Sequence, residues 1–123
     1  RCLVPATGFY EWDHRSGQAV RMRICPEGMQ NPFLMAGLWD YARIGGQESR
    51  PCLVILTAPA LPPISDFHDR MPILMTEVGQ ARWLDGSVPL SDGIDGIRSA
   101  GGVLWEGPLR MVPSPRTERA ANA

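Results

Sequence analysis

The sequence lacks an excess of either charge: 12 basic residues stand against 13 acidic ones, which gives a net charge of −1. Lysine is absent, because all 12 basic residues are arginines, and we attribute this to a bias of overall composition. A protein with this balance has no strong overall field that would attract nucleic acid or a membrane. A site for a polyanion must therefore be local.

Cysteine and histidine are also scarce. The three cysteines, Cys2, Cys25 and Cys52, are irregularly spaced and form no Cys-x-x-Cys pair, so they predict neither a disulfide framework nor a zinc site. Only His14 and His68 could add imidazole ligands, and we expect no metal and no cofactor. This use of cysteine fits a reducing compartment, so we expect a cytoplasmic protein that associates with the nucleoid when it acts on DNA.

Long apolar runs are absent as well. The run at residues 53–56 is far shorter than the roughly 20 apolar residues that a helix needs to cross a bilayer. We therefore expect no membrane partner and, since Pro5 and Gly8 interrupt the N-terminal region, no signal peptide. The chain opens inside patterned sequence without an initiator Met, so we expect it to be part of a longer product.

The sequence does contain a series of short strand-like runs separated by glycine and proline. These runs cover residues 3–4, 8–12, 19–24, 33–41, 52–57, 73–75, 103–104 and 109–112. The loops at 13–17 and 44–48 are typical of hairpins, and segments 76–84 and 91–100 predict helices, the first with Thr76 as its N-cap. Together with 12 prolines and 13 glycines, this pattern predicts an α+β fold with a bent, mainly antiparallel β-sheet or barrel and a few short helices.

The length of 123 residues and the hydrophobic content of 44% suit a single domain, in which a chain of this size buries roughly two-thirds of its unfolded surface. We assign residues 1–115 to this domain. Residues 116–123 lack an apolar pattern, and we expect them to form a flexible C-terminal tail.

A carboxylate lies between two aromatic residues in the stretch GFYEW. Strand alternation turns Glu11 to the face opposite Tyr10 and Trp12. Glu11 is then a candidate proton donor if apolar groups surround it, or an ordinary solvated glutamate if they do not. Trp12 could stack on a nucleic-acid base at the rim of such a site. Tryptophans are more often core residues than binding groups, and we expect this of Trp39, Trp83 and Trp105.

A dense polar cluster precedes an apolar run in the stretch DFHDRMP, residues 66–72. His68 can exchange protons near neutral pH, and Arg70 can bind a phosphate with two donors. The alternative is a surface turn whose aspartates cap backbone amides. The methionines from Met71 to Met75 are typical of core filler.

Several motifs together resemble those of one known family. They are RCLVPATGFYEW, FLMAGLWD, LVILTAPA, HDRMPILM and WLDG, in this order. With these motifs, nearly the whole chain is similar to the SOS response-associated peptidase (SRAP) family. The resemblance implies an α+β fold around a bent antiparallel sheet. It also implies binding of single-stranded DNA, a covalent crosslink to abasic sites, and a peptidase activity that processes the protein itself.

The resemblance further implies roles for five residues. Glu11 matches a catalytic glutamate that assists sugar ring opening and proton transfer at the attacking amine. His68 matches a catalytic histidine that protonates the departing sugar oxygen. Arg70 matches a phosphate contact, and Trp12 and Thr57 match DNA contacts. The family's nucleophile is an N-terminal cysteine, whose amine and thiol close a thiazolidine ring with the abasic aldehyde.

By the same resemblance, the segment that carries the nucleophile lies outside this chain. Cys2 is not its counterpart, because the Cys2 nitrogen is in the peptide bond to Arg1 and offers no free amine. We therefore expect residues 1–115 to be a partial SRAP domain that associates with the missing N-terminal segment or with another chain. Two alternatives stay open: a catalytically dead remnant that binds single-stranded DNA or a partner, and a hydrolase that uses Glu11 and His68.

Overall fold

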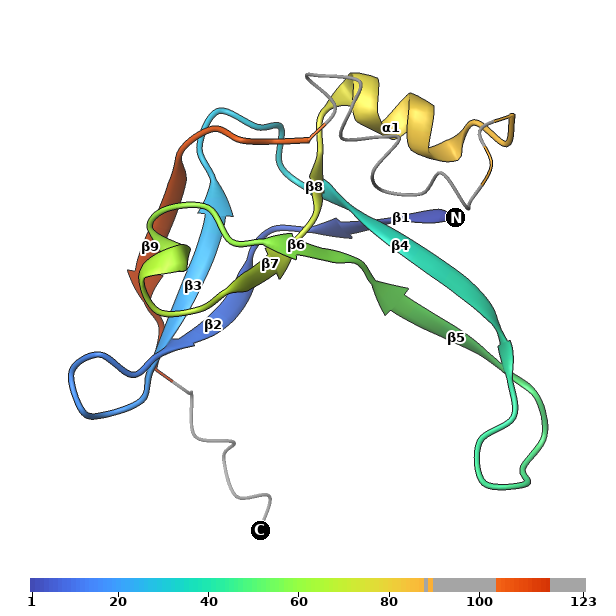
Figure 1. Ribbon diagram of the computed structural model, residues 1–123, viewed down its shortest axis with the longest axis horizontal. Coiled ribbons are helices and arrows are strands. Elements are labelled where there is room, and N and C mark those ends of the chain that lie inside the picture. Colours follow the sequence, from blue (N-terminus) through green and yellow to red (C-terminus); the bar gives the residue numbers. More distant parts are fainter. Residues whose placement is uncertain (88, 90–103, 116–123) are drawn as a thin grey trace, which may run out of the picture.

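The computed structural model describes residues 1–87, 89 and 104–115. The helix predicted over residues 91–100, the start of the strand predicted over 103–104 and the C-terminal tail lie outside these residues. The described part is built mainly from antiparallel strands with one α-helix and one short 3-10 helix (Figure 1). The predicted α+β fold with a mainly antiparallel sheet is confirmed.

One sheet is organised around a single long strand. Strand β4 (Phe33–Ala42) pairs on one side with β1 (Cys2–Ala6), and on the other side with β5 (Arg50–Ile55) and then β8 (Leu74–Met75). All of these pairings are antiparallel. The predicted hairpin between β4 and β5 is present.

A second sheet has three antiparallel strands in the order β2 (Phe9–Asp13), β3 (Val20–Pro26) and β9 (Leu109–Pro113). The predicted hairpin at residues 13–17 joins β2 to β3. Gly17 has a φ of +83° in this turn, a conformation that residues with a Cβ atom rarely adopt. Strand β2 pairs only with β3 among the described strands, so it forms one edge of this sheet.

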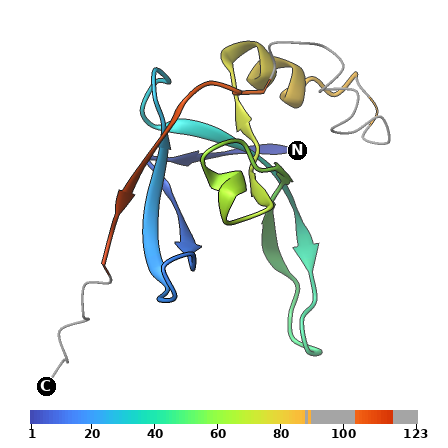
Figure 2. The same cartoon turned by 60° about the vertical axis from the view of Figure 1, so that its left-hand side comes forward.

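The segment between the two sheets carries a small strand pair. Strand β6 (Thr57–Pro59) pairs with β7 (Arg70–Pro72), and the 3-10 helix η1 (Ile64–Asp66) lies in the connection between them. Figure 2 shows the β2–β3 and β4–β5 hairpins diverging, with this connection between them. Helix α1 (Glu77–Leu84) follows β8, and the Thr76 hydroxyl accepts a hydrogen bond from the Gly79 amide at 3.1 Å. Thr76 is therefore the N-cap, as predicted.

The core has two clusters of buried side chains. The larger joins the two sheets to the η1 connection, and it contains Ile24, Phe33, Met35, Ile64, Met71, Leu74 and Leu109. The smaller lies under α1 and contains Ala36, Ile73, Met75 and Trp83. The predicted core role of Met71 and Met75 is confirmed, since they are 5% and 1% exposed.

The tryptophans depart in part from the prediction that they are core residues. Trp83 is 1% exposed, but Trp39 is 53% exposed, so the prediction for Trp39 was wrong. The reason is the length of β4. Strand β1 pairs with β4 only as far as Gly37, beyond which β4 and β5 continue as a two-stranded ribbon.

Among the described helices, none is long and apolar enough to span a bilayer.

Candidate active site and nucleic-acid interface

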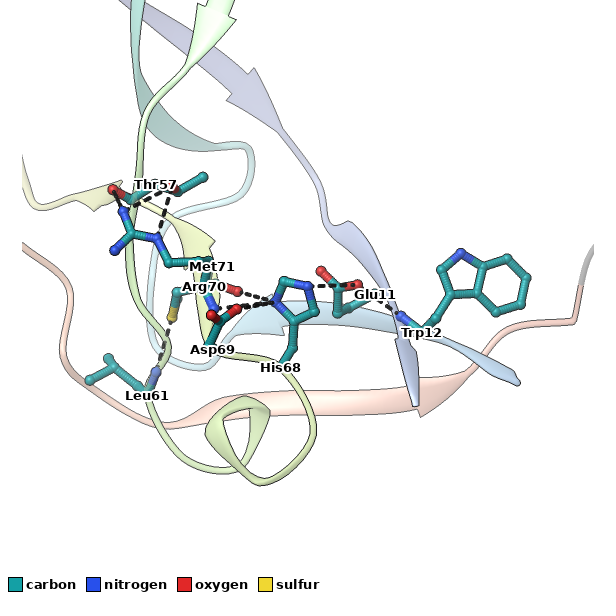
Figure 3. A network of polar contacts seen from close by, with 8 residues as sticks. All are labelled: Glu11, Trp12, Thr57, Leu61, His68, Asp69, Arg70 and Met71. Carbon is teal, nitrogen blue, oxygen red and sulfur yellow. Dashed lines mark hydrogen bonds and ion pairs between the residues drawn. The ribbon is translucent and has the colours of Figure 1, made fainter. Parts of the chain in front are cut away.

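The two candidate acid–base groups face each other. Strand alternation turns Glu11 of β2 toward the η1 connection, and His68 of that connection approaches it. His68 Nε2 lies 3.7 Å from Glu11 Oε1 (Figure 3). The His68 side chain is 39% exposed and the Glu11 side chain is 23% exposed, so the pair is half-buried and still open to a ligand. The predicted separation of Glu11 from its aromatic neighbours is confirmed, because Tyr10 and Trp12 lie on the exposed face of the strand.

The other ring nitrogen of His68 contacts the backbone of Arg70. His68 Nδ1 lies 2.8 Å from the Arg70 carbonyl oxygen and 3.2 Å from the Arg70 amide nitrogen. The carbonyl contact needs a proton on Nδ1 and the amide contact needs a lone pair there, so one tautomer satisfies only one of them. Both contacts are made by Nδ1, so the Arg70 backbone holds the ring on that side and leaves Nε2 facing Glu11.

Backbone contacts fix the position of the His68 loop. The His68 amide donates to the Ile64 carbonyl at 2.9 Å, and the Ala60 amide donates to the Asp69 carbonyl at 2.9 Å. Ile64 is fully buried and Met71 nearly so, so apolar side chains anchor the loop on both sides of His68. A loop held in this way presents its imidazole with little conformational freedom.

Arg15 connects the β2–β3 hairpin to the same loop. Its guanidinium hydrogen-bonds the Asp13 carboxylate, with the shortest contact at 2.7 Å, and lies 3.8 Å from the Asp66 carboxylate. Its Cζ atom is also 5.1 Å from the centroid of the Phe67 ring. The hydrogen bonds from Arg15 lower the pKa of Asp13 to about 2. Arg15 thus ties the strand that carries Glu11 to the segment that carries His68.

Arg70 and Thr57 form a second polar pair. Arg70 Nη2 donates to the Thr57 carbonyl at 2.7 Å and to the Thr57 hydroxyl at 3.0 Å, and Nε also contacts this hydroxyl at 3.2 Å. The two residues lie diagonally across the β6–β7 pair, because Thr57 is opposite Pro72 and Arg70 is opposite Pro59. Thr57 therefore orients the guanidinium, whose Nη1 makes none of these bonds.

The structure brings the predicted site residues together in two pairs and leaves one apart. Glu11 meets His68 and Arg70 meets Thr57, while Trp12 points away from His68 (Figure 3). Trp12 is 38% exposed, as a stacking platform requires. Within the described part of the chain, no group of three or more His, Cys, Asp or Glu side chains could hold a metal ion.

Sequence reasoning missed Arg15. The signal was present, because Asp13 and Arg15 are two residues apart in a hairpin loop, where an aspartate commonly binds nearby backbone and side-chain donors. The Arg15 amide does donate to Asp13 Oδ1, at 3.0 Å. The link to Phe67 joins residues about 50 positions apart and follows only from the tertiary structure.

The fold and these motifs define a family. The family model for SOS response associated peptidase (SRAP) matches residues 1–98, and the chain belongs to this family. Two relatives are named abasic site processing proteins: YoqW of Bacillus subtilis, 36% identical over 69% of this chain, and HMCES of Gallus gallus, 30% identical over 96%. The chain spans only 38% and 41% of the length of these two relatives.

Solved structures agree with this assignment. A protein from Bordetella bronchiseptica has a TM-score of 0.71 and 29% identity over 94% of this chain and 55% of its own. A phage-related protein from the same organism has a TM-score of 0.62 and 29% identity over 93% of this chain and 53% of its own. The similarity therefore extends over most of the present chain and about half of each neighbour.

Proposed function

We propose that this chain supplies the acid–base pair and part of the DNA contact surface of a protein that crosslinks to abasic sites in single-stranded DNA. The observation that carries the proposal is the 3.7 Å approach of His68 Nε2 to Glu11 Oε1. The names of YoqW and HMCES support the choice of an abasic site as the substrate.

The chemistry would use the two side chains in sequence. Glu11 would take the proton of the anomeric hydroxyl and pass a proton to the ring oxygen as the abasic sugar opens to its aldehyde. Ionised again, it would then accept a proton from the amine that attacks that aldehyde. His68 would give its Nε2 proton to the departing oxygen, which leaves as water when the Schiff base forms. A thiol on the same residue as the amine would then add to the C=N bond and close a thiazolidine ring. Reversal would use the same proton transfers in the opposite order.

Arg70 would hold a phosphate beside this centre. Thr57 already orients its guanidinium, so little side-chain freedom would be lost on binding. Trp12 and Thr57 would contact the DNA. The amine and thiol would come from an N-terminal cysteine upstream of this chain, because the Cys2 nitrogen is an amide here. The same Glu11–His68 pair would serve the peptidase activity that the family description names.

The test is a denaturing-gel shift with an oligonucleotide that carries one abasic site. It compares this chain with a version extended upstream to an N-terminal cysteine. We expect only the extended protein to form a crosslink, and we expect replacement of its N-terminal cysteine to abolish it. A crosslink formed by this chain alone would overturn the assigned nucleophile, and no crosslink from either protein would overturn the proposed activity.

A second candidate is a remnant that binds single-stranded DNA without chemistry. The exposure of Trp12 and the ordered Arg70 favour it, because both features serve binding alone. Binding without crosslinking by the extended protein would select this candidate.

A further inference from the structure

The outer face of the β2–β3–β9 sheet has a distinctive composition. Residues paired across antiparallel strands share a face, and the registers pair Tyr10 with Arg23, Trp12 with Arg21, Arg23 with Val112, and Cys25 with Arg110. The alternate residues, including Glu11 and Ile24, lie on the opposite face toward the core and the His68 loop. We call the face formed by Tyr10, Trp12, Arg21, Arg23, Cys25, Arg110 and Val112 the outer arginine face.

In the described part of the chain, carboxylates do not neutralise the positive charge on this face. Arg23 donates to the Thr7 carbonyl at 2.6 Å, and Arg21 donates to the Ser114 and Pro115 carbonyls at 2.9 and 3.0 Å. Among the described residues, no carboxylate lies within ion-pair distance of Arg21, Arg23 or Arg110. Three arginines thus share one face of a protein whose net charge is −1, which gives this face a local positive charge that attracts anions.

Exposed aromatic rings lie among these arginines. Tyr10 is 53% and Trp12 38% exposed, and Arg21 Cζ is 4.5 Å from the centroid of the Tyr10 ring. A cavity of about 230 Å³ lies at the other end of the face, and Arg23 and Arg110 are among the residues that line it. No acidic residue lines this cavity. Interleaved aromatics and cations suit a chain of bases and phosphates, because the rings accept bases and the guanidinium groups accept phosphates.

The outer arginine face and the Glu11–His68 pair lie on opposite faces of the same strand, β2. Strand β2 is an edge, so no neighbouring described strand separates its two faces on that side. Tyr10 and Trp12 of one face and Glu11 of the other are successive residues of β2. A single-stranded DNA whose abasic sugar lies at Glu11 can therefore turn around the β2 edge and continue over the outer arginine face.

We propose that the nucleotides flanking the abasic site lie on the outer arginine face, with bases stacked on Trp12 and Tyr10 and phosphates bound by Arg21, Arg23 and Arg110. This inference rests on the proposed function, since it assigns a path to the DNA of that same site. The face extends about 13 Å along β3 from Arg21 to Cys25 and about 10 Å across the three strands. It therefore accommodates only a few nucleotides.

The test measures noncovalent binding of a fluorescently labelled, unmodified single-stranded oligonucleotide by anisotropy at several salt concentrations. The variants are Arg23→Ala with Arg110→Ala, Arg110→Glu alone, and Tyr10→Ala. Arg43→Ala is the matched control, since Arg43 is exposed in the β4–β5 loop. We expect the double variant to bind at least about threefold more weakly and to lose about 0.7 from the salt slope for each arginine removed. Arg110→Glu reverses a charge and should weaken binding further than the double alanine variant does. Arg43→Ala should not change binding.

The outcomes separate this inference from the proposed function. If the parent chain binds and Arg70→Ala weakens it, but the Arg23, Arg110 and Tyr10 variants bind like the parent, the outer path is overturned and the proposed function stands. If the parent chain does not bind single-stranded DNA at low salt, both fail. If polyglutamate competes as well as DNA and Tyr10→Ala has no effect, the face takes acidic polymers in general, and the assignment to DNA is overturned. Circular dichroism tests whether each variant is folded. Arg110→Glu changes only an exposed side chain, so we expect that variant to fold.

Discussion

Arg15 lies over the ring of Phe67, with its Cζ atom 5.1 Å from the ring centroid, and so joins the hairpin that follows Glu11 to the segment that precedes His68. The two catalytic candidates come from segments far apart in the sequence, and their separation depends on how those segments are held. We infer that Arg15 is a positioning residue for the pair.

Replacing Arg15 with alanine should therefore reduce the crosslinking rate of the extended protein more than it reduces stability. The Arg15 side chain is half-exposed, so water screens its ion pairs and the free energy of unfolding should decrease only slightly. Gel kinetics and a thermal melt measure the two effects. Arg15→Lys keeps the charge but loses the planar group, so it should recover only part of the rate. A rate that falls only in proportion to the folded fraction would contradict the positioning role.

The acid sensitivity of the fold should include a contribution from Asp13. Its pKa is lowered from 3.8 to about 2 by the hydrogen bonds from Arg15. A group with a lowered pKa in the folded state stabilises the protein above its unfolded pKa, and this stabilisation is lost as the pH falls through the folded pKa. Stability should therefore decrease between about pH 4 and pH 2. Asp13→Asn should show less of this decrease in urea unfolding followed by circular dichroism, and an unchanged pH profile would contradict the role of Asp13.

Removing either member of the acid–base pair should affect chemistry more than folding. Glu11→Gln and His68→Asn in the extended protein should each slow crosslinking by about 100-fold. Both side chains are partly exposed, so stability should change by only about 0.5 kcal/mol. Glu48→Gln, in the exposed β4–β5 loop, serves as the control. Equal losses of thermal stability in both variants, without a specific loss of rate, would indicate a structural pair.

The N-cap of α1 offers a test of local stability. Thr76→Ala removes the oxygen that accepts the Gly79 amide, and we expect a loss of about 1 kcal/mol. Thr76→Ser keeps an acceptor and should lose less. Noncovalent DNA binding should be unchanged in both variants, because α1 lies outside the proposed site. Urea unfolding and anisotropy measure the two quantities, and weaker DNA binding by a folded Thr76 variant would place α1 in the interface.

The local pattern predicted most of the strands and the two hairpins. Alternation in FYEWD placed Glu11 opposite Tyr10 and Trp12, and glycines marked the turns. The break at Leu56 could not be predicted from the continuous strand-like run over 52–57. It arises because the Leu56 amide donates to Ala36, and its carbonyl accepts from Ile73. These partners belong to distant segments, so they leave no local signal.

The site was predictable as a set of residues but not as a geometry. Family motifs predict that Glu11 and His68 act in one reaction, and the structure brings the two side chains to 3.7 Å of each other. Nothing in the sequence predicted that Arg70 would bind Thr57 with two of its nitrogens or that Arg15 would reach Phe67. Trp39 shows the opposite error, because its apolar character indicated burial while the short partner strand β1 left it exposed.

The tryptophans give the molecule distinct optical reporters. Trp83 is 1% exposed and donates its indole N–H to the Cys2 carbonyl at 2.8 Å, whereas Trp39 is 53% and Trp12 38% exposed. Emission from Trp83 should lie toward the blue and shift to the red when α1 detaches. Emission from Trp39 should already resemble that of indole in water, and an ionic quencher such as iodide should reduce emission from Trp39 and Trp12 more than emission from Trp83. Trp105 is also partly buried, against the larger core cluster, so in a Trp105→Phe variant a change in the blue component reports the attachment of α1 to β1, independently of events at Trp12.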